Sequence, residues 1–420
     1  MSETKPKIAI IQFPGSNCET ESLYAITQAG MDAEEFLWNR PISDLDGFDG
    51  YFIIGGFSFE DRSRSGVISA KNLLMIGIIA EAKKGKPVLG ICNGAQVLVE
   101  AGLVPGLKDE KLGGALAVNK RFQNNEILGT GFYNSWVNIK NISRSNAFCR
   151  NFEPNQVFAI PIAHGEGRFI LAPEVIETMR NNGQFLFQYS DKDGSIHDEF
   201  PLNPNGSFES LAAIGNPSGN IMAMMPHPER ALEKGGKLIF ESMRDYILDL
   251  KSGKINFVWK DLEIELNETK PRIFELKKEN LNLIIDAIIT DNEAVTVEQT
   301  LNNLGIDCKL KKLILWEIAG HDVDKEKLIK SELFFNSNKE FVIEDFAETN
   351  FDYNSVVAVQ YKNDFVGQSK LQSLHHLGDQ SVTHIAKKTI WLISGDVDKV
   401  MESGILANQF SQIVEVNHKI

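Results

Sequence analysis

The sequence contains few cysteines and no long apolar run. Its four cysteines, Cys18, Cys92, Cys149 and Cys308, are scattered and form no C-x-x-C pair. This argues against a disulfide framework or a structural zinc site, and it fits a reducing compartment. No apolar stretch reaches membrane-spanning length, and the first residues lack the apolar core of a signal peptide. We therefore expect a cytoplasmic protein with no membrane partner and no metal.

Positive charge is also scarce. The 43 lysines and arginines are outnumbered by 57 aspartates and glutamates, which gives a formal net charge of −14. A generally basic face is therefore not expected, and we predict no nucleic-acid partner. The phosphate-binding pattern G-x-x-x-x-G-K-[ST] is absent from the sequence. What the 420 residues do offer is enough length for two or three domains with real cores.

The first part of the chain alternates apolar runs with helical patterns. Residues 7–13, 51–56 and 87–91 have the composition of buried strands, and helical spacing lies between and after them. Strands that are apolar on both faces and alternate with helices predict a parallel sheet covered by helices. We expect this α/β domain over residues 1–251, followed by a mixed, charged linker over residues 252–279.

The rest of the chain repeats itself. Residues 291–305 align with residues 364–378, and Trp316 aligns with Trp391. Each copy is predicted to run strand, helix, strand, helix, strand, which is the split βαβ pattern of ferredoxin-like folds. The predicted copies span residues 280–346 and 352–420.

Cys92 lies at a chemically distinctive position. It follows a buried strand and precedes a helical pattern, between Gly90 and Gly94. A side chain there projects from the carboxyl end of a parallel strand, where open α/β sheets bind ligands. The glycines permit a tight, strained turn, and the helix start supplies N–H donors that favour a thiolate or a developing oxyanion. The pattern predicts a nucleophile elbow with sulfur in place of oxygen.

A thiol nucleophile needs a base, and the base needs an orienting carboxylate. The segment MMPHPER provides both after one strand, as His227 and Glu229. A cysteine near glycines is by itself usually a core residue, but this downstream segment and the turn at Gly55 and Gly56 favour catalysis. Cys18 also follows a strand, yet it has no partner motif, so we assign it to packing.

Five separated segments resemble the triad-type, or class I, glutamine amidotransferases. In chain order they are FPGSNCETE, GGFSFED, GICNGAQVL, IAHGEGRF and MPHPER. More closely, they are similar to the glutaminase component of phosphoribosylformylglycinamidine synthase, an enzyme of purine biosynthesis. The resemblance covers about residues 5–250 and implies a flavodoxin-like domain that hydrolyses glutamine to glutamate and ammonia.

The resemblance also implies roles for single residues. Cys92 would attack the side-chain amide to give a γ-glutamyl thioester, His227 would shuttle the proton, and Glu229 would orient His227. The residues implied to hold glutamine or its oxyanion are Gly55, Gly56, Asn93, Gln96, Asn119, Arg121 and Phe122. Where the family usually has tyrosine and glycine, this chain has Phe59 and Glu60. Because Glu60 cannot take positive φ as freely as glycine, we expect a loop of different shape.

The tandem repeat resembles the small accessory (PurS-like) subunit of the same enzyme, a ferredoxin-like protein that pairs as a dimer. Two copies in one chain resemble a covalent version of that dimer. The chain would then lack the ATP-dependent synthetase. We therefore expect a separate synthetase subunit that binds ATP, magnesium and formylglycinamide ribonucleotide and receives the ammonia, with no cofactor in this chain.

Two other function classes stay open at this point. One is a cysteine hydrolase, or a glutaminase of the same fold that serves another acceptor. The other is a non-catalytic assembly protein in which the tandem repeat is the working part. The choice of substrate separates the first from a purine-biosynthesis glutaminase, and an unreactive Cys92 would favour the second.

Overall fold

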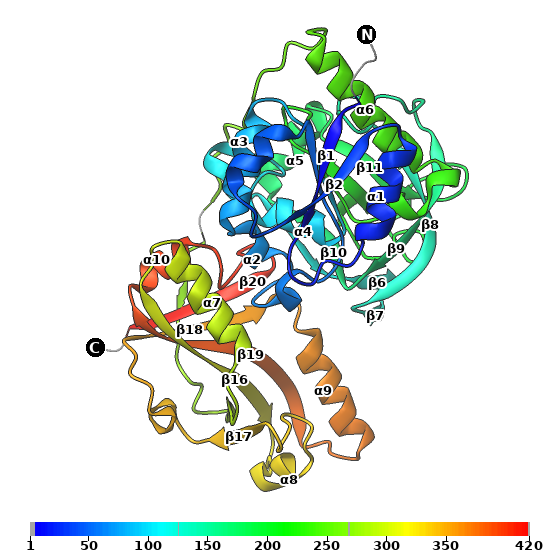
Figure 1. Cartoon of the computed structure of the whole chain (residues 1–420). Coiled ribbons are helices and arrows are strands. Elements are labelled where there is room, and N and C mark those ends of the chain that lie inside the picture. The colour runs from blue at the N-terminus through cyan, green and yellow to red at the C-terminus, as the bar shows by residue number, and fades with distance from the viewer. Residues whose placement is uncertain (1–4, 125, 268, 419–420) are drawn as a thin grey trace. The chain divides into compact units, whose positions relative to one another are not determined.

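The chain folds into two compact units, Met1–Asn267 and Glu268–Ile420 (Figure 1). The structure, a computed structural model, describes residues 5–124, 126–267 and 269–418, so the outermost residues of the predicted first and last domains lie outside the described residues. No helix within these described ranges is long and apolar enough to cross a membrane.

A nine-stranded sheet forms the centre of the first unit. Its parallel half contains, in spatial order, β2 (Asp32–Leu37), β1 (Lys7–Gln12), β3 (Gly50–Ile53), β4 (Val88–Ile91) and β13 (Ile221–Met224). The antiparallel half continues with β12 (Leu211–Gly215), β11 (Phe185–Ser190), β8 (Tyr133–Asn141) and β9 (Val157–His164). Strands β3, β4 and β13 are buried along their whole length, as expected where helices cover both faces of a parallel sheet.

Helices cover this sheet, so the predicted α/β domain is confirmed. Helix α1 (Glu19–Gln28) packs against α6 (Lys237–Lys251), while α4 (Asn93–Glu100) packs against β3, β4 and β13 and against the short α2 (Val67–Ala70). The remaining helices of this unit are α3 (Leu73–Lys83) and α5 (Pro173–Asn181).

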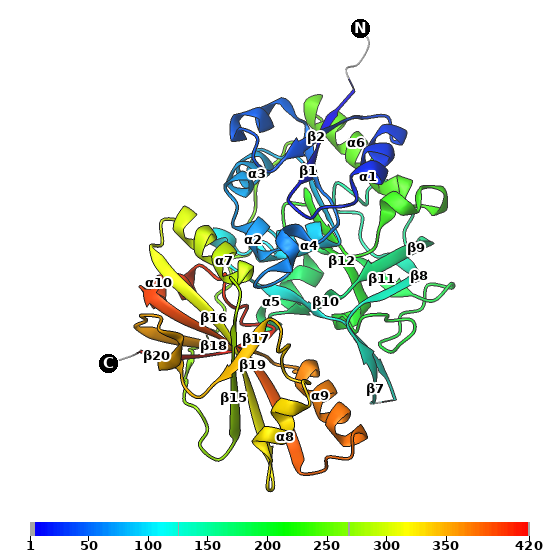
Figure 2. The same ribbon diagram turned by 60° about the horizontal axis from the view of Figure 1, so that its bottom comes forward.

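Two smaller sheets complete the first unit. One pairs β5 (Gly114–Val118) with β10 (Glu166–Leu171), and the other pairs β6 (Lys120–Gln123) with β7 (Glu126–Thr130). Figure 2 shows β7 extending away from the rest of this unit. The chain that continues from this hairpin includes Phe132, which lines a cavity of this unit.

The segment that follows α6 belongs to the first unit. The ring of Phe257 lies over Gly85, where an added Cβ would be 2.8 Å from Phe257 Cγ. Leu262 forms a β-bridge with Leu107 and is buried. These apolar anchors place the boundary between the units after residue 267, later than the predicted end of the first domain.

The second unit is built on a seven-stranded sheet. Its spatial order is β14 (Arg272–Ile273), β20 (Gln412–His418), β18 (Ser355–Tyr361), β19 (Val382–Gly395), β16 (Cys308–Gly320), β15 (Leu281–Ala287) and β17 (Glu340–Ile343). All neighbouring strands are antiparallel except β14 and β20. The helices are α7 (Asn292–Asn303), α8 (Lys325–Lys330), α9 (Phe365–His376) and α10 (Val397–Glu402).

The long strands β16 and β19 join two halves with the same order of elements. Each half runs strand, helix, strand, helix, strand. The pairing of β16 with β19 places Ile314 opposite Thr389. In the alignment that matches Trp316 with Trp391, these two paired residues also match each other. The local twofold axis of the repeat therefore passes between Ile314 and Thr389.

Candidate active site

Cys92 connects β4 to α4 and carries the strain of the connection. Its φ of 52° and ψ of −108° place a non-glycine residue in a sparsely populated region, which costs about 1–3 kcal/mol. The side chain is almost fully buried, and its Sγ lies 3.8 Å from the carbonyl oxygen of Ala163 on β9. Such strain persists only where the surrounding structure holds it, and that is typical of functional sites.

The neighbouring glycines have a different role from the one we expected. The left-handed φ belongs to Cys92 itself and to neither Gly90 nor Gly94. An added Cβ on Gly94 would lie 1.9 Å from the carbonyl oxygen of Ile53, and one on Gly90 would lie 2.5 Å from the carbonyl oxygen of Gly94. The glycines thus let the start of α4 approach β3 and β4 closely, which brings the helix amides next to the thiol.

His227 and Glu229 follow β13, the neighbour of β4 in the sheet. The His227 amide donates to the Pro161 carbonyl at 2.9 Å, and Nδ1 of His227 donates to Oε1 of Glu229 at 2.6 Å. Both side chains are buried. Burial disfavours the charged imidazole, but the Glu229 carboxylate and the Cys92 thiol outweigh it and hold the pKa of His227 well above its ordinary value.

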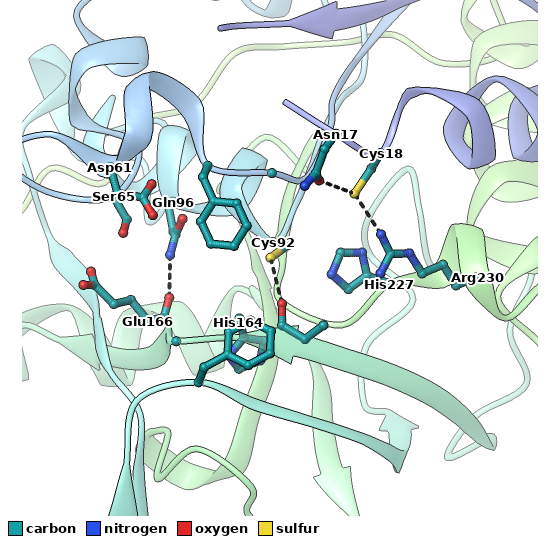
Figure 3. Close-up of a pocket in the computed structure, with 15 residues that line it drawn as sticks. Asn17, Cys18, Asp61, Ser65, Cys92, Gln96, His164, Glu166, His227 and Arg230 are labelled. Atoms are coloured by element: carbon teal, nitrogen blue, oxygen red, sulfur yellow. Dashed lines mark hydrogen bonds between the residues drawn. The ribbon is translucent and has the colours of Figure 1, made fainter. Parts of the chain in front are cut away.

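Cys92 and His227 line one end of a cavity of about 290 Å³. Figure 3 shows Cys92 and His227 on one side, with Asp61, Ser65 and Glu166 gathered beyond Gln96. The lining residues are Asn17, Cys18, Gly56, Phe57, Asp61, Ser65, Cys92, Gln96, Phe132, Ala163, His164, Gly165, Glu166, His227 and Arg230. The pocket therefore has a nucleophilic end and an acidic end.

The acidic end holds two carboxyl groups whose pKa values are displaced upward. Burial raises the pKa of Glu166 to about 7, against a hydrogen bond from Ser65 that lowers it. Burial likewise raises the pKa of Asp61 to about 6. Carboxyl groups in this condition ionise readily when a cationic group arrives beside them.

The structure brings several predicted site residues to the pocket. Gly56 and Gln96 line it, and Gln96 Nε2 donates to the Glu166 carbonyl at 2.6 Å. Asn93 does not line it, because its side chain accepts from the Ser58 amide and donates to Oε1 of Gln96 at 2.9 Å. The Asn93 amide opens α4, where N–H groups have no acceptor within the helix.

The predicted Asn-Arg-Phe segment lies farther out. Asn119 is buried and supports the loop before β10, donating to the His164 carbonyl at 2.7 Å and accepting from the Gly167 amide at 2.8 Å. Arg121 and Phe122 lie on β6, outside the pocket lining. Their contact with a substrate stays a prediction.

The loop after Gly56 takes the conformation that we expected Glu60 to resist. Phe59, Glu60 and Asp61 have φ values of 50°, 56° and 55°. The left-handed region costs a non-glycine residue about 1–2 kcal/mol. The chain accepts that cost here, and Asp61 thereby reaches the pocket wall.

Several pocket residues are not among the site residues assigned from the sequence, and two of them, His164 and Cys18, lie beside the catalytic groups. His164 is buried, and burial, followed by the charge of His227, lowers the pKa of His164 to about 3. Cys18 was assigned to packing alone, yet it lines the pocket and its Sγ accepts from the Arg230 guanidinium at 3.1 Å. The order of strands in the sheet explains how Cys18 reaches the pocket. Strand β1, which precedes Cys18, lies beside β3, and β3 lies beside β4, which precedes Cys92.

Comparison with known proteins agrees with this arrangement. The family model described as a CobB/CobQ-like glutamine amidotransferase domain matches residues 5–246. The chain is 42% identical over 263 residues to phosphoribosylformylglycinamidine synthase subunit PurQ of Methanothrix thermoacetophila, covering 59% of this chain and 100% of the relative. It is 40% identical over 228 residues to the same subunit of Aquifex aeolicus, covering 54% of this chain and 92% of the relative.

A chain of the PurLQS structure from Thermotoga maritima is also similar, with 30% identity and a TM-score of 0.47. The similarity covers 58% of this chain and 100% of that one. The coverage of the PurQ relatives, together with the family model, is decisive. Through its first unit, this chain belongs to the PurQ family of glutamine amidotransferases.

Proposed function

We propose that this protein is the glutaminase component of phosphoribosylformylglycinamidine synthase in purine biosynthesis. It hydrolyses glutamine and passes ammonia to a separate synthetase subunit. The observation that carries the proposal is the arrangement of Cys92 beside the hydrogen-bonded His227–Glu229 pair in a pocket of a PurQ-family chain. Glu229 stabilises the imidazolium, and the imidazolium favours the thiolate.

The chemistry follows from these groups. The Cys92 thiolate attacks the side-chain amide carbon of glutamine, and the amide oxygen becomes an oxyanion. In this proposal the backbone amides of Asn93 and Gly56 bind that oxyanion. His227 gives its proton to the departing nitrogen, so that ammonia leaves and a γ-glutamyl thioester remains. A water molecule then gives its proton to His227 and attacks the thioester, which releases glutamate and restores the thiol group's starting state.

The acidic end of the pocket suits the other end of glutamine. With the side-chain amide at Cys92, the α-ammonium group lies toward Asp61 and Glu166. A cation between these two carboxyl groups favours their ionised forms and repays the cost of their burial. Asp61 and Glu166 thus select a free amino acid, since a glutamine residue inside a peptide has no α-ammonium group.

A group of exposed apolar side chains near the pocket mouth supports docking of the synthetase subunit. Phe57 and Phe132 line the pocket and are about half exposed, and Ile127, Leu128 and Trp136 are exposed on or near the β7–β8 segment. Exposed apolar groups that lie together mark interaction sites. A subunit docked there would cover the pocket and receive ammonia without loss to solvent.

We further propose that the second unit is a pair of ferredoxin-like, PurS-like repeats joined in one chain. The identical element order of the two halves and the twofold register at Ile314 and Thr389 support this assignment. Covalent joining keeps both copies beside the glutaminase at a high effective concentration. ATP and magnesium then belong to the synthetase subunit, and this chain needs no cofactor of its own.

Glutamate release from glutamine tests the proposal. The native chain, Cys92→Ala and the matched control Cys308→Ala, which changes a buried cysteine of the second unit, are each assayed alone. They are then assayed with a candidate synthetase chain, ATP, magnesium and formylglycinamide ribonucleotide. We expect release that depends on Cys92, survives Cys308→Ala and rises in the complete mixture.

The other outcomes identify the competing functions. Release that depends on Cys92 but ignores the synthetase mixture would point to another acceptor. Cleavage of a peptide in preference to free glutamine would indicate a peptidase of the same fold. Absence of any Cys92-dependent release would leave an assembly protein as the best explanation.

A further inference from the structure

The side chain of Asn93, directly after the nucleophile Cys92, joins three parts of the active site. It is only 2% exposed. Its Oδ1 accepts from the Ser58 amide at 3.1 Å. Its Nδ2 donates to Oδ1 of Asp61 at 3.3 Å and to Oε1 of Gln96 at 2.9 Å. One buried amide group therefore contacts the loop that carries Ser58, the acidic end of the pocket, and the pocket wall between the two ends.

The hydrogen-bonding groups of asparagine suit this position. A side-chain amide offers an acceptor oxygen and two N–H donors. Here the oxygen accepts from a backbone N–H, and the nitrogen donates to two oxygen atoms. An aspartate would place a second carboxylate beside Asp61, and a leucine would leave the buried Ser58 amide without this acceptor. The position thus requires a neutral side chain that both donates and accepts.

Asn93 is connected to both carboxyl groups of the acidic end. The bond to Asp61 is direct. The second connection passes through Gln96, whose Nε2 donates to the Glu166 carbonyl oxygen at 2.6 Å (Figure 3). A hydrogen bond from Ser65 lowers the pKa of Asp61 and of Glu166 against the effect of burial, so these carboxyl groups are linked to each other as well. The acidic end and the residue next to the nucleophile therefore belong to one hydrogen-bonded network.

The helix side of this network is rigid, and the loop side is strained. An added Cβ on Gly94 would lie 1.9 Å from a carbonyl oxygen of β3, so the start of α4 is packed tightly on the sheet. In the loop, residues 59–61 all have positive φ, and such conformations persist only where other contacts hold them. Asn93 supplies two of those contacts, through Ser58 and through Asp61. A change in either contact therefore acts on the loop more than on the helix.

Occupation of the acidic end changes the strength of one of these contacts. Burial raises the pKa of Asp61 to about 6, and a cation that arrives beside this carboxyl group favours its ionised form. A hydrogen bond to a carboxylate is about twice as strong as one between neutral groups. The bond from Asn93 to Asp61 therefore tightens when an α-ammonium group binds.

We propose that Asn93 is a positioning residue that couples the binding of an α-ammonium group at Asp61 to the assembly of the oxyanion hole. The coupling rests on the proposed function, which assigns the α-ammonium group of glutamine to the acidic end. When the contact with Asp61 tightens, the loop is held against the start of α4, and the amides of Gly56 and Asn93 are fixed in place for the oxyanion. Glutamine thus completes the site that hydrolyses it, and an amide without an α-ammonium group does not.

Alkylation of Cys92 in the full chain tests the coupling without requiring glutamine hydrolysis. One reagent is a chloromethyl ketone in which CH₂Cl replaces the side-chain NH₂ of glutamine, and the other is the same ketone without its α-amino group. In each case the thiolate attacks the CH₂Cl carbon, a C–S bond forms and chloride leaves. The ketone oxygen takes the place of the amide oxygen, so the maximal rate of alkylation reports on the oxyanion hole. Mass spectrometry follows the adduct on Cys92.

The quantity compared is the ratio of the two maximal rates, the α-amino reagent over the other reagent. In the native chain we expect the α-amino reagent to react faster. Asn93→Ala should lower the ratio about tenfold, since a charge-assisted hydrogen bond is lost. Asn93→Ser, a milder change, should lower it in the same direction. A general loss of structure would slow both reagents and leave the ratio unchanged.

Two further comparisons make the test decisive. Asp61→Asn should lower the ratio, and its combination with Asn93→Ala should lower it no further, because Asn93 acts through Asp61. Asn220 provides the matched control, since it is fully buried and its Nδ2 donates to the carbonyl oxygens of Ala82 and Lys86 at 2.8 and 3.0 Å, outside the pocket lining. Asn220→Ala should keep the native ratio, although it also removes a buried amide group.

The results separate this coupling from the catalytic proposal. The coupling alone is overturned if Asn93→Ala and Asn93→Ser keep the native ratio, if the losses add in the double variant, or if only the half-saturating concentration changes. A native chain that does not prefer the α-amino reagent overturns both the coupling and the proposed contact at Asp61. A chain whose ratio depends on Asn93 but which shows no Cys92-dependent glutamate release retains the coupling and disproves the glutaminase function.

Discussion

One buried cluster of ionisable side chains from each unit can be compared, and the two clusters are built by different rules. The catalytic cluster of Cys92, His227 and Glu229 combines a strained backbone with two unpartnered buried atoms. The sheet cluster is formed by Lys388, Glu317 and Glu415. Its Lys388 ammonium lies 3.0 Å from Glu317 and 2.7 Å from Glu415, so the charges are paired. The first cluster keeps groups available for chemistry, whereas the ion pairs of the second serve structure.

The second unit contains a second set of residues at positions equivalent to those of the sheet cluster, and these residues are apolar. In the repeat alignment Lys388 corresponds to Leu313 and Glu317 to Leu392. Glu415 and Ile343 are equivalent by pairing, because they lie opposite Ala358 and Ile284 on the matching strands. The three counterparts, Leu313, Leu392 and Ile343, belong to one buried hydrophobic cluster. Both sites draw residues from both halves, so two equivalent positions of the sheet are filled by ions in one case and by apolar side chains in the other.

The largest expected effect comes from weakening the catalytic cluster. Glu229→Gln leaves the shape of the carboxyl group but removes the charge that stabilises the His227 imidazolium. We expect kcat for glutamate release to fall about 10³-fold, or about 4 kcal/mol in the barrier. The thermal midpoint should change little, so steady-state kinetics and calorimetry are measured together. If Glu229→Gln lowered the thermal midpoint so far that the protein unfolded under assay conditions, the fall in kcat would reflect lost structure, and Glu229 would be mainly structural.

The next effect comes from breaking the sheet cluster. Lys388→Met removes the buried cation from both carboxylates and leaves Glu317 only the exposed Lys277 at 3.5 Å, so we expect a loss of about 3 kcal/mol in the free energy of unfolding. Copying the equivalent apolar site, with Lys388→Leu, Glu317→Leu and Glu415→Ile together, should recover that loss. Urea unfolding of the single and triple variants provides the comparison, and glutamate release should stay at the native level in both. A triple variant no more stable than Lys388→Met would contradict the idea that the two sites are interchangeable in packing.

A smaller effect lies at the acidic end of the pocket, where burial of Glu166 opposes the ionisation of its carboxyl group. The pKa of Glu166 is raised to about 7 in the folded protein, against an ordinary value near 4.3 in the unfolded chain. Between about pH 4.3 and about pH 7 the Glu166 carboxyl group therefore keeps its proton in the folded state but has lost it in the unfolded state. As the pH rises through this range, the folded protein becomes less stable relative to the unfolded chain. At pH 8 Glu166→Gln should be more stable than the native chain by about 2 kcal/mol, and at pH 4 the difference should vanish.

Unfolding across this pH range in the absence of glutamine gives the measurement. Glu177→Gln, on the exposed surface of α5, controls for the loss of one charge. If Glu166 also binds the α-ammonium group of glutamine, Glu166→Gln raises the KM for glutamine, whereas Glu177→Gln does not. A KM equal to that of the native chain would remove Glu166 from the proposed substrate contacts.

The smallest effect concerns the strain at Cys92. Glycine adopts positive φ freely and alanine does not, so Cys92→Gly should be more stable than Cys92→Ala by about 1 kcal/mol. At Cys149, which is buried and is not among the described residues with positive φ, the order should reverse. Thermal unfolding of the four variants checks both differences. If Cys92→Ala were more stable than Cys92→Gly, the backbone at position 92 would not be strained.

The catalytic residues could be predicted from the sequence because their signals are local. Cys92 lies in one strand-to-helix turn, and His227 and Glu229 are separated by a single proline. Cys18 and Asp61 could not be assigned in this way. They reach the pocket only because β1, β3 and β4 are neighbours in the sheet and because the loop after Gly56 takes left-handed conformations, which no local pattern reports.

The second unit shows the same division between local and non-local information. The matching tryptophans, Trp316 and Trp391, were enough to predict two copies of one element order. The register of β16 with β19 depends on how two distant strands meet, so spacing alone did not predict it. The sheet cluster was missed for a related reason: where lysine replaces leucine, the repeat looks less similar, and the buried pairing that compensates is visible only in the folded chain.

The join between β16 and β19 has a consequence for how this protein can change over time. In a dimer of identical chains, every mutation is made twice, once on each side of the axis, and must be acceptable in both places. Here a mutation near Ile314 leaves Thr389 as it was. Each side of the axis can therefore change separately, and two halves with the same order of elements can take on different tasks.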